Sequence, residues 1–369
     1  MKYGNYPDLT RVKKILVIKL RHHGDVLLTS PVFSNLQAAI PQAEIHAMVY
    51  KDTVPMLDGH PAIQKFLSYD RGWKKLGFFG KGFKELSLLK SVRKEKYDLV
   101  INLTEGDRGA IAAFVSRAKI CVGIDPEGKG FKGKRKIYSH LVKNCKTPRH
   151  TVEKNLDALR RIGIFPTPEE RDLFFSLPVE SIKRVHQLLE ESGVSPQGYF
   201  LLHPVSRWKF KCWPPSLVAK LIQDLHQRGE KIVVSASPDV SELQMVDEIL
   251  TLVPEVPVLN LAGKTSLKDL GALIEMSRCL VCVDSVPLHM SSALKTPTVV
   301  LFGPTSEINW GPWQNQKARV VTQNLPCRPC FMDGCGGSKK SDCLLTLPVS
   351  SVLSAIDRLV LESVSGGLR

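Results

Sequence analysis

The feature that most restricts the fold is an alternation of short β-rich runs with helix-like segments, which occurs twice along the chain. The first series begins with KILVIKL at residues 14–20 and continues through EIHAMVY to DLVINLT. The second series runs from YFLLHP through KIVVSAS and CLVCVDS to PTVVLFG. Alternation of this kind is typical of βαβ units on a parallel sheet, so the sequence predicts an α/β fold.

The alternation of strand-like and helix-like segments is interrupted between the two series, at FFSLPVE, residues 174–180. We therefore expect two similar α/β domains, at residues 1–177 and 178–345. Residues 346–369 carry apolar side chains at helical spacing and predict a final packing helix and tail. A cleft between two such domains is the natural ligand site.

The charge of the chain points to an anionic partner. The formal net charge is +15, and 43% of the residues are hydrophobic, which suits a folded protein with proper cores. Nucleic acid, an acidic membrane face and a phosphorylated substrate are all anionic partners that this positive charge would attract. No apolar run approaches the roughly 20 residues that cross a bilayer, and the first ten residues are polar, so we expect a cytoplasmic protein.

Polar or small residues follow four predicted strands of the second series. Strand ends that lead into helices offer backbone N–H groups and partial positive charge, which is the physical basis of phosphate binding. Several such ends predict a diphosphate site, although each one alone also fits an ordinary capped turn. No GxGxxG or Walker loop is present, which counts against a nicotinamide enzyme or an NTPase. The four segments are HPVSRWKFKCWP (203–214), SASPDVSE (235–242), DSVPLHMSSAL (284–294) and FGPTSEINW (302–310).

A single carboxylate, Asp25, stands in the basic turn RHHGDVLLTSPV that follows the first predicted strand. Ligands in parallel α/β sheets bind at the carboxyl ends of the strands, so the position of Asp25 favours a functional role. The alternative is an N-cap for the helix that begins there.

Four parts of the sequence form a recognisable set: RHHGDVLLTSPV, HPVSRWKFKCWP, the stretch from LAGKTSLKDL to LFGPT, and the WGPW motif. Together they resemble the bacterial lipopolysaccharide heptosyltransferases, glycosyltransferase family 9. RHHGDVLLTSPV and FKCW most resemble the heptosyltransferase III branch. The resemblance runs from about Lys14 to the tail helix. It implies a GT-B fold: two Rossmann-like domains, the first binding the acceptor and the second the donor, facing each other across a cleft.

The resemblance also implies the reaction. The donor is ADP-L-glycero-β-D-manno-heptose, and the acceptor is the phosphorylated inner core of lipopolysaccharide, at the cytoplasmic face of the inner membrane. Transfer inverts the anomeric centre and requires no metal or other cofactor. The heptosyltransferase I and II steps and a nucleotide-sugar transferase for another sugar stay open. From another class, a basic nucleic-acid-binding protein stays open, although no nucleic-acid motif is present.

Site residues follow from matching the family's motifs position by position. Asp25 is the candidate base that takes the proton of the acceptor hydroxyl, and Lys211 is the candidate for neutralising the diphosphate. Val205 stands where some members carry a second hydroxyl. The full set of donor-binding candidates is Ser206, Arg207, Lys211, Asp239, Glu242, Asp284, Ser285, Val286, His289, Gly303, Pro304 and Thr305, where only one of Asp239 and Glu242 is needed for the sugar hydroxyls.

Basic residues supply the acceptor candidates. Residues 123–149 are rich in glycine, lysine and arginine and predict a mobile basic loop or a small excursion. Their charge suits the phosphates of lipid A and of the core sugars, and it would also favour an anionic leaflet. The acceptor-binding candidates are Arg21, His22, His23, Lys134, Arg135 and Arg149.

The nine cysteines are an odd number, and five of them are scattered singly, which indicates reduced cytosolic thiols rather than a disulfide scaffold. The other four form a CxxC pair followed by gaps of four and seven residues: Cys327, Cys330, Cys335 and Cys343. Zinc uses compact cysteine spacing of this kind. The family resemblance implies no catalytic metal, so we assign no metal ligand, and whether these four thiols bind a metal stays open.

Overall fold

A computed structural model describes residues 6–366 of the chain. The chain divides into two compact units, Met1–Ser176 and Leu177–Arg369. The division lies one residue before the boundary expected from the sequence. The helix expected in 346–369 belongs to the second unit rather than to a separate part, and residues 367–369 lie outside the described chain.

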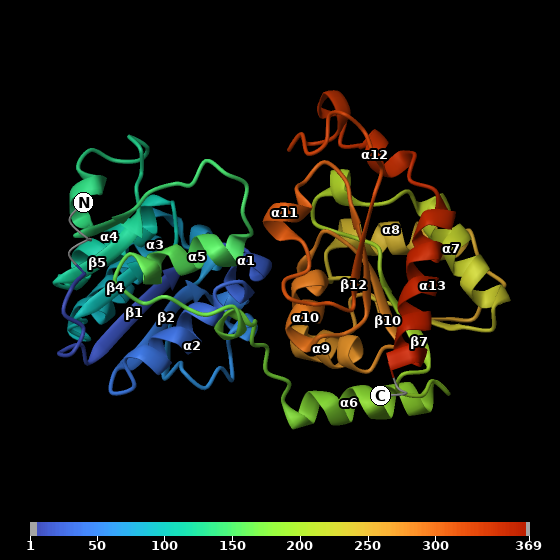
Figure 1. Cartoon of the computed structure of the whole chain (residues 1–369), viewed down its shortest axis with the longest axis horizontal. Coiled ribbons are helices and arrows are strands. Elements are labelled where there is room, and N and C mark those ends of the chain that lie inside the picture. The colour runs from blue at the N-terminus through green and yellow to red at the C-terminus, as the bar shows by residue number, and fades with distance from the viewer. Residues whose placement is uncertain (1–5, 367–369) are drawn as a thin grey trace. The chain divides into compact units, whose positions relative to one another are not determined.

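The first unit is built on a six-stranded parallel sheet with the strand order β3-β2-β1-β4-β5-β6 (Figure 1). Its strands are β1 (Lys14–Lys19), β2 (Glu44–Tyr50), β3 (Lys65–Tyr69), β4 (Leu99–Asn102), β5 (Ile120–Ile124) and β6 (His140–Val142). Its α-helices are α1 (His23–Leu27), α2 (Ser30–Ala39), α3 (Gly77–Lys94), α4 (Asp107–Ser116) and α5 (Thr151–Arg160). Short 3-10 helices are η1 (Lys51–Met56), η2 (Arg71–Leu76), η3 (Lys134–Ile137) and η4 (Glu169–Arg171).

The second unit repeats this plan with the strand order β12-β11-β10-β7-β8-β9. Its strands are β7 (Tyr199–His203), β8 (Lys231–Val234), β9 (Val258–Asn260), β10 (Cys279–Val283), β11 (Thr298–Phe302) and β12 (Ala318–Thr322). Its α-helices are α6 (Val179–Glu191), α7 (Pro215–Gln227), α8 (Val240–Thr251), α9 (Leu267–Glu275), α10 (Val286–Leu294), α11 (Glu307–Trp310), α12 (Asp342–Leu345) and α13 (Val349–Gly366). The 3-10 helices are η5 (Lys209–Lys211) and η6 (Cys335–Gly337).

Continuous apolar runs explain why the central strands lie in the middle of each sheet. In β1 every residue after Lys14 is buried, and in β10 and β11 every residue is buried. Strands covered by helices on both faces need apolar side chains at each position, which is the pattern of a parallel sheet. Helix α13 completes the core of the second unit with Val352, Ile356 and Leu359.

The order of strands changes direction once in each sheet. In the first unit the chain proceeds from β1 outward to β3 and then returns to the other side of β1 with β4. In the second unit it proceeds from β7 to β9 and returns beside β7 with β10. Crevices form outside the carboxyl ends of the strands at such switch points, and these two places position the candidate site residues.

Candidate active site

Three donor-site candidates meet at the switch point of the second sheet. Lys211 ends η5, in the loop after β7, whereas Asp284 directly follows β10 and Thr305 follows β11. The Lys211 Nζ atom lies 2.7 Å from Asp284 Oδ2, and the Thr305 hydroxyl donates to the same oxygen at 2.6 Å. Strands β7, β10 and β11 are neighbours, so their carboxyl ends bring together residues that are 73 and 21 positions apart.

This group combines a buried carboxylate with a cation that solvent still reaches. The Asp284 side chain is 5% exposed and that of Lys211 is 17% exposed. A buried carboxylate requires a partner, and Lys211 and Thr305 provide it. An ammonium has three N–H donors, so Lys211 can bind Asp284 and still donate to an anionic oxygen. The arrangement therefore holds a cation at the sheet edge in a defined position.

The segment between β7 and η5 places two further candidates. The Ser206 side chain is buried, and its oxygen accepts a hydrogen bond from the Trp208 N–H at 3.3 Å. Arg207 is exposed, with its guanidinium 5.5 Å from the centre of the Trp208 ring. Val205 is fully buried in the core of the second unit, which gives this position a packing role in place of a hydroxyl.

The start of α10 lies beside Asp284. Ser285 is the N-cap residue in extended conformation, and its hydroxyl donates to the Val283 carbonyl at 3.2 Å rather than capping the helix. Val286 is the first helical residue, so its N–H belongs to the unpaired N-terminal turn. His289, one turn further, is buried. Backbone donors thus point out of α10 next to the Lys211–Asp284 pair, as an anion site requires.

Asp239 and Glu242 have different environments at the start of α8. Asp239 is exposed and caps the helix by accepting from the Ser241 N–H at 2.9 Å. Glu242 is buried, and its Oε2 atom accepts from the Ser237 N–H at 3.0 Å. Of the two carboxylates, Asp239 is the one that a sugar hydroxyl in solution can reach, and it stays the better candidate.

The segment that carries the first two clustered cysteines supports the backbone at Gly303 and Pro304. The Arg328 Nε atom donates to the Gly303 carbonyl at 2.7 Å, and the Phe331 N–H donates to the Pro304 carbonyl at 2.9 Å. A side chain at Gly303 would come within 2.6 Å of Leu344 Cδ1, so a larger residue here would require Leu344 to move. These contacts hold Thr305 against Asp284.

Asp25 occupies the equivalent switch point of the first sheet. It lies in the first turn of α1, just after β1, and its side chain is 20% exposed. Its carboxylate lies 3.9 Å from the Arg21 guanidinium. The N-cap residue of α1 is His22, so capping does not explain Asp25. The carboxylate is therefore held at the sheet edge and remains accessible.

Lys19 is a residue beside Asp25 that the sequence reasoning missed. It is the last residue of β1, and its side chain is buried, donating to the Leu103 carbonyl at 3.2 Å and to Asn155 Oδ1 at 3.1 Å. Burial lowers its pKa to about 8, and the charge of Asp25 opposes this shift. A lysine at the end of an otherwise apolar strand was the available signal, because such a strand is buried on both faces.

The depressed pKa of Lys19 predicts a pH dependence of stability. Its unfolded pKa is near 10.5 and its folded pKa near 8, so the unfolded chain binds more protons between these values. Stability contributed through Lys19 therefore rises with pH across that window. Compared with Lys19→Met, the wild-type free energy of unfolding should increase by about 2 kcal/mol from pH 8 to pH 10. Urea unfolding at both pH values measures this, and parallel pH curves for the two proteins would contradict it.

The basic acceptor candidates do not form one free surface. His23 lies 2.9 Å from the Asp52 carbonyl through Nε2, and Arg149 pairs with Asp157. Arg135 pairs with Asp125 and is 65% exposed. Arg21 is also exposed, whereas His22 is partly buried.

Lys134 lies in a different environment from the other acceptor candidates. This side chain is buried, and its ammonium donates to the Glu105 carbonyl at 2.5 Å and to Asp107 at 3.0 Å. The segment for which we expected a mobile basic loop or a small excursion contains η3 and the edge strand β6. The sequence could not show these contacts, because five of the six basic candidates lie within 4.0 Å of an acid up to 29 residues away.

Within the described residues, no group of three or more His, Cys, Asp or Glu side chains is arranged to hold a metal. Cys343 is buried, and burial raises the pKa of its thiol to about 11. The Asp342 N–H donates to the Cys335 sulfur at 3.4 Å. The buried Cys343 therefore contributes to the packing of this segment.

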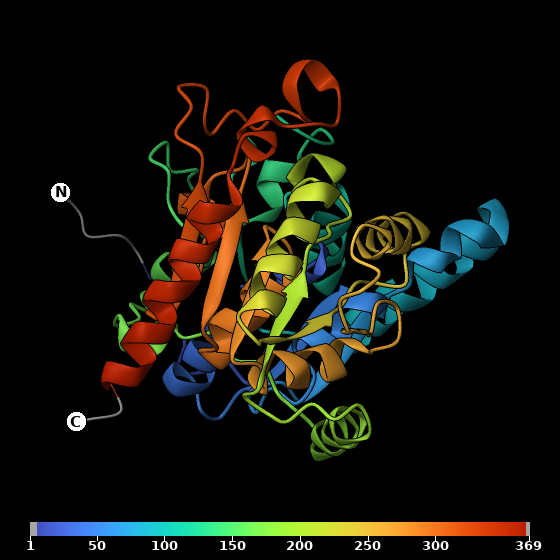
Figure 2. The same ribbon diagram turned by 90° about the vertical axis from the view of Figure 1, so that its right-hand side faces the viewer.

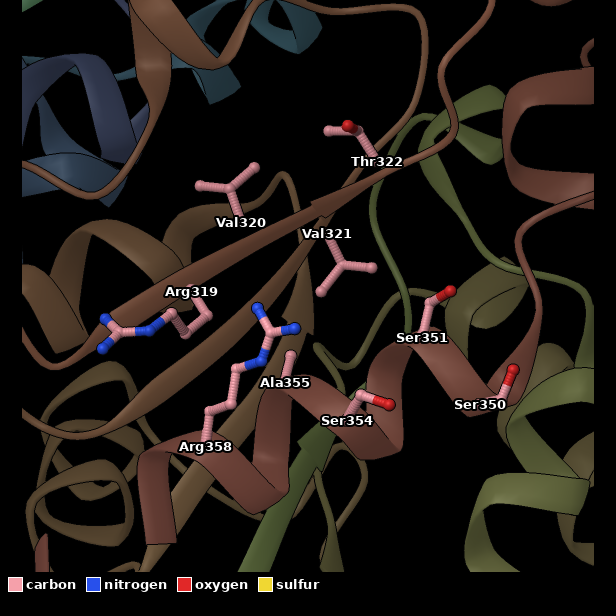
Figure 3. A pocket seen from close by; sticks show the side chains of 9 residues that line it. All are labelled: Arg319, Val320, Val321, Thr322, Ser350, Ser351, Ser354, Ala355 and Arg358. Atoms are coloured by element: carbon pink, nitrogen blue, oxygen red, sulfur yellow. The ribbon is translucent and has the colours of Figure 1, made fainter. Parts of the chain in front are cut away.

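A cavity of about 430 Å³ lies apart from these residues, between the edge strand β12 and α13 (Figure 3). Arg319 and Arg358 contribute to its wall together with hydroxyls, among them Thr322 and Ser354. Arg319 already donates to the Gln316 and Ala318 carbonyls and pairs with Glu362. None of the donor-site candidates lines this cavity, so we do not place the donor there.

Comparison with known proteins identifies the family of the chain. A family model described as "Glycosyltransferase family 9 (heptosyltransferase)" matches residues 85–340. Lipopolysaccharide heptosyltransferase 3 of Escherichia coli (strain K12) is 35% identical over 347 residues, which cover 93% of this chain and 97% of the relative.

Solved structures share the fold. A glycosyltransferase family 9 protein from Veillonella parvula DSM 2008 matches with a TM-score of 0.79 at 22% identity, covering 97% of this chain and 100% of the other. An E. coli heptosyltransferase solved with ADP-2-deoxy-2-fluoro heptose matches with a TM-score of 0.72 at 19% identity, covering 94% and 99%. The predicted GT-B fold, with two parallel sheets, is confirmed. The chain belongs to glycosyltransferase family 9, the heptosyltransferases.

Proposed function

We propose that the chain transfers L-glycero-D-manno-heptose from ADP-heptose to a heptose of the lipopolysaccharide inner core, the step named heptosyltransferase 3 in its relatives. The observation that carries this proposal is the match to that enzyme over nearly the full length of both chains. A cation held by a buried carboxylate, beside the start of α10, suits the diphosphate of such a donor.

The reaction that we propose inverts the anomeric centre. Asp25 takes the proton from the acceptor hydroxyl as that oxygen forms its bond to the anomeric carbon. The bond from this carbon to the phosphate oxygen breaks, and ADP leaves with the electron pair. Lys211 and the backbone N–H group of Val286 stabilise the charge that builds on the leaving diphosphate.

The acceptor links the protein to the membrane. No helix in residues 6–366 is long and apolar enough to cross a bilayer. We propose that the protein acts peripherally, at the anionic cytoplasmic face of the inner membrane, where its net charge of +15 favours association. Arg21 and Arg135 are exposed, whereas Lys134 is buried, and all three stay candidates for the acceptor phosphates.

A transfer assay tests the substrate and the acceptor together. The full chain is incubated with ADP-heptose and a set of soluble core oligosaccharides truncated at successive sugars, and the products are weighed by mass spectrometry. We expect one added heptose only on acceptors that already contain the core heptoses. Addition to a heptose-free acceptor would assign a different step, and no addition to any acceptor would reject heptose transfer to the core.

A further inference from the structure

Helix α3 exposes an apolar stripe to solvent. Leu76 ends η2, and Phe79, Phe83 and Leu86 follow on α3 at intervals of four and three residues, which places these three on one face of the helix. Their exposed fractions are 51%, 88%, 72% and 53%, and Phe78 beside them is 88% exposed. Single exposed apolar residues are ordinary, but five of them on adjacent turns form a patch that indicates a binding surface.

The opposite face of α3 already holds the helix on its unit. Val92 is buried, and Leu88 and Leu89 pack against the core that contains Tyr69. Glu85 accepts a hydrogen bond from the Tyr69 hydroxyl at 2.5 Å. The first two turns make no such contribution, and in Figure 2 the helix, in light blue, extends outward from the first unit. The fold therefore does not need the exposed phenylalanines.

Positive charge surrounds the stripe. Residues 71–94 contain eight lysines and arginines and one acidic residue, Glu85. Lys74 and Lys75 precede the stripe on η2, Lys84 lies between its turns, and Lys90 continues it towards the end of the helix. An apolar face with phenylalanine and leucine, bordered by lysines, is typical of a helix that lies in the interface of a membrane.

We infer that η2 and the first half of α3, residues 71–86, bind the surface of an anionic phospholipid membrane, with Phe79 and Phe83 entering the headgroup region and the lysines contacting lipid phosphates. The inference rests on the proposed function only in that the acceptor is itself membrane-bound. Residues 71–86 are then the surface that brings the chain to the bilayer.

Charge favours a bilayer over a second copy of the chain as the occupant. Two copies that met through this stripe would bring Lys74, Lys75 and Lys84 of each chain close to those of the other, and like charges oppose such a contact. An anionic leaflet complements the same lysines and accepts the phenylalanine rings at once. Both kinds of contact are then satisfied by one partner.

Vesicle sedimentation of the full chain tests the inference without any sugar donor. The vesicles contain phosphatidylethanolamine and phosphatidylglycerol in one series and phosphatidylcholine alone in the other. We expect the variant Phe79→Ser/Phe83→Ser to bind the anionic vesicles at least about tenfold more weakly than the wild type. The matched control is Phe165→Ser, which removes an exposed phenylalanine of the same unit outside α3 and should bind like the wild type.

A charge variant separates the two contributions. Lys84→Glu/Lys90→Glu should weaken binding to the anionic vesicles several-fold, and added salt should reduce this difference. Wild-type binding that Phe79→Ser/Phe83→Ser leaves unchanged would overturn the inference. So would a wild type that binds no vesicles but forms dimers that the same variant dissociates.

A second measurement keeps this inference distinct from the proposed function. Transfer to a soluble core oligosaccharide needs no membrane, so Phe79→Ser/Phe83→Ser should retain the wild-type rate there. A variant that loses vesicle binding while the wild type transfers no heptose would support the membrane surface and reject the proposed reaction. Normal transfer with unchanged vesicle binding would support the proposed reaction and reject the membrane surface.

Discussion

Replacing Asp25 by asparagine is expected to lower kcat for heptose transfer by about 10² to 10⁴-fold, the range that a positioned general base contributes. Asparagine keeps the size of the side chain but does not accept the proton of a sugar hydroxyl. The rate is measured with saturating ADP-heptose and a soluble core acceptor. Because Asp25 belongs to the first unit and the donor candidates to the second, the affinity for ADP should stay nearly unchanged.

Two controls make the Asp25 experiment decisive. Arg21→Ala removes the guanidinium that lies 3.9 Å from the carboxylate and should raise KM for a phosphorylated acceptor more than it lowers kcat. Thermal unfolding of Asp25→Asn checks that the fold persists. A folded Asp25→Asn protein that retains most of the wild-type rate would show that another group accepts the proton.

Replacing Lys211 by alanine is expected to weaken ADP binding by about tenfold to a hundredfold, because one charge-assisted hydrogen bond to the diphosphate is lost. The rate of transfer should fall further, since the charge on the leaving group grows in the transition state. The same variant leaves the buried Asp284 carboxylate with only the Thr305 hydroxyl, so stability should fall by about 3 kcal/mol. Calorimetric titration with ADP and urea unfolding measure the two effects.

Asp284→Asn separates the binding role of Lys211 from its pairing with Asp284. This variant keeps the side-chain volume but removes the negative charge that Lys211 neutralises. If Lys211 binds the diphosphate, Asp284→Asn should retain or strengthen ADP affinity while Lys211→Ala weakens it. Equal losses of ADP affinity in both variants would mean that the ion pair serves the fold alone.

Local patterns allowed much of the fold to be predicted. The apolar runs at β1, β7, β10 and β11 are strands because residues buried on both faces of a parallel sheet must all be apolar. The same argument failed at residues 123–149, where lysines and glycines indicated a loop and the structure contains β6. An edge strand of three residues has too few apolar positions to be recognised.

Part of the candidate site was also visible in the sequence. Lys211, Asp284 and Thr305 were each assigned to the donor site from their motifs, and the structure brings them within hydrogen-bonding distance. Lys19 was missed, and the burial of Lys134 was not expected. In both cases a lysine is buried against acceptors far along the chain, at Asn155 and at Asp107, and no local pattern reports such a partner.

The sequence by itself determined the two α/β halves, the family and the motifs that carry the candidate residues, because periodicity and motif residues are local properties of the chain. Only the tertiary structure decided which of these residues meet. The order of parallel strands places β10 beside β7 and β4 beside β1, so that Asp284 reaches Lys211 and the Leu103 carbonyl after β4 reaches Lys19. It also decided that the phenylalanines of α3 face solvent, since the same residues would suit a buried helix equally well.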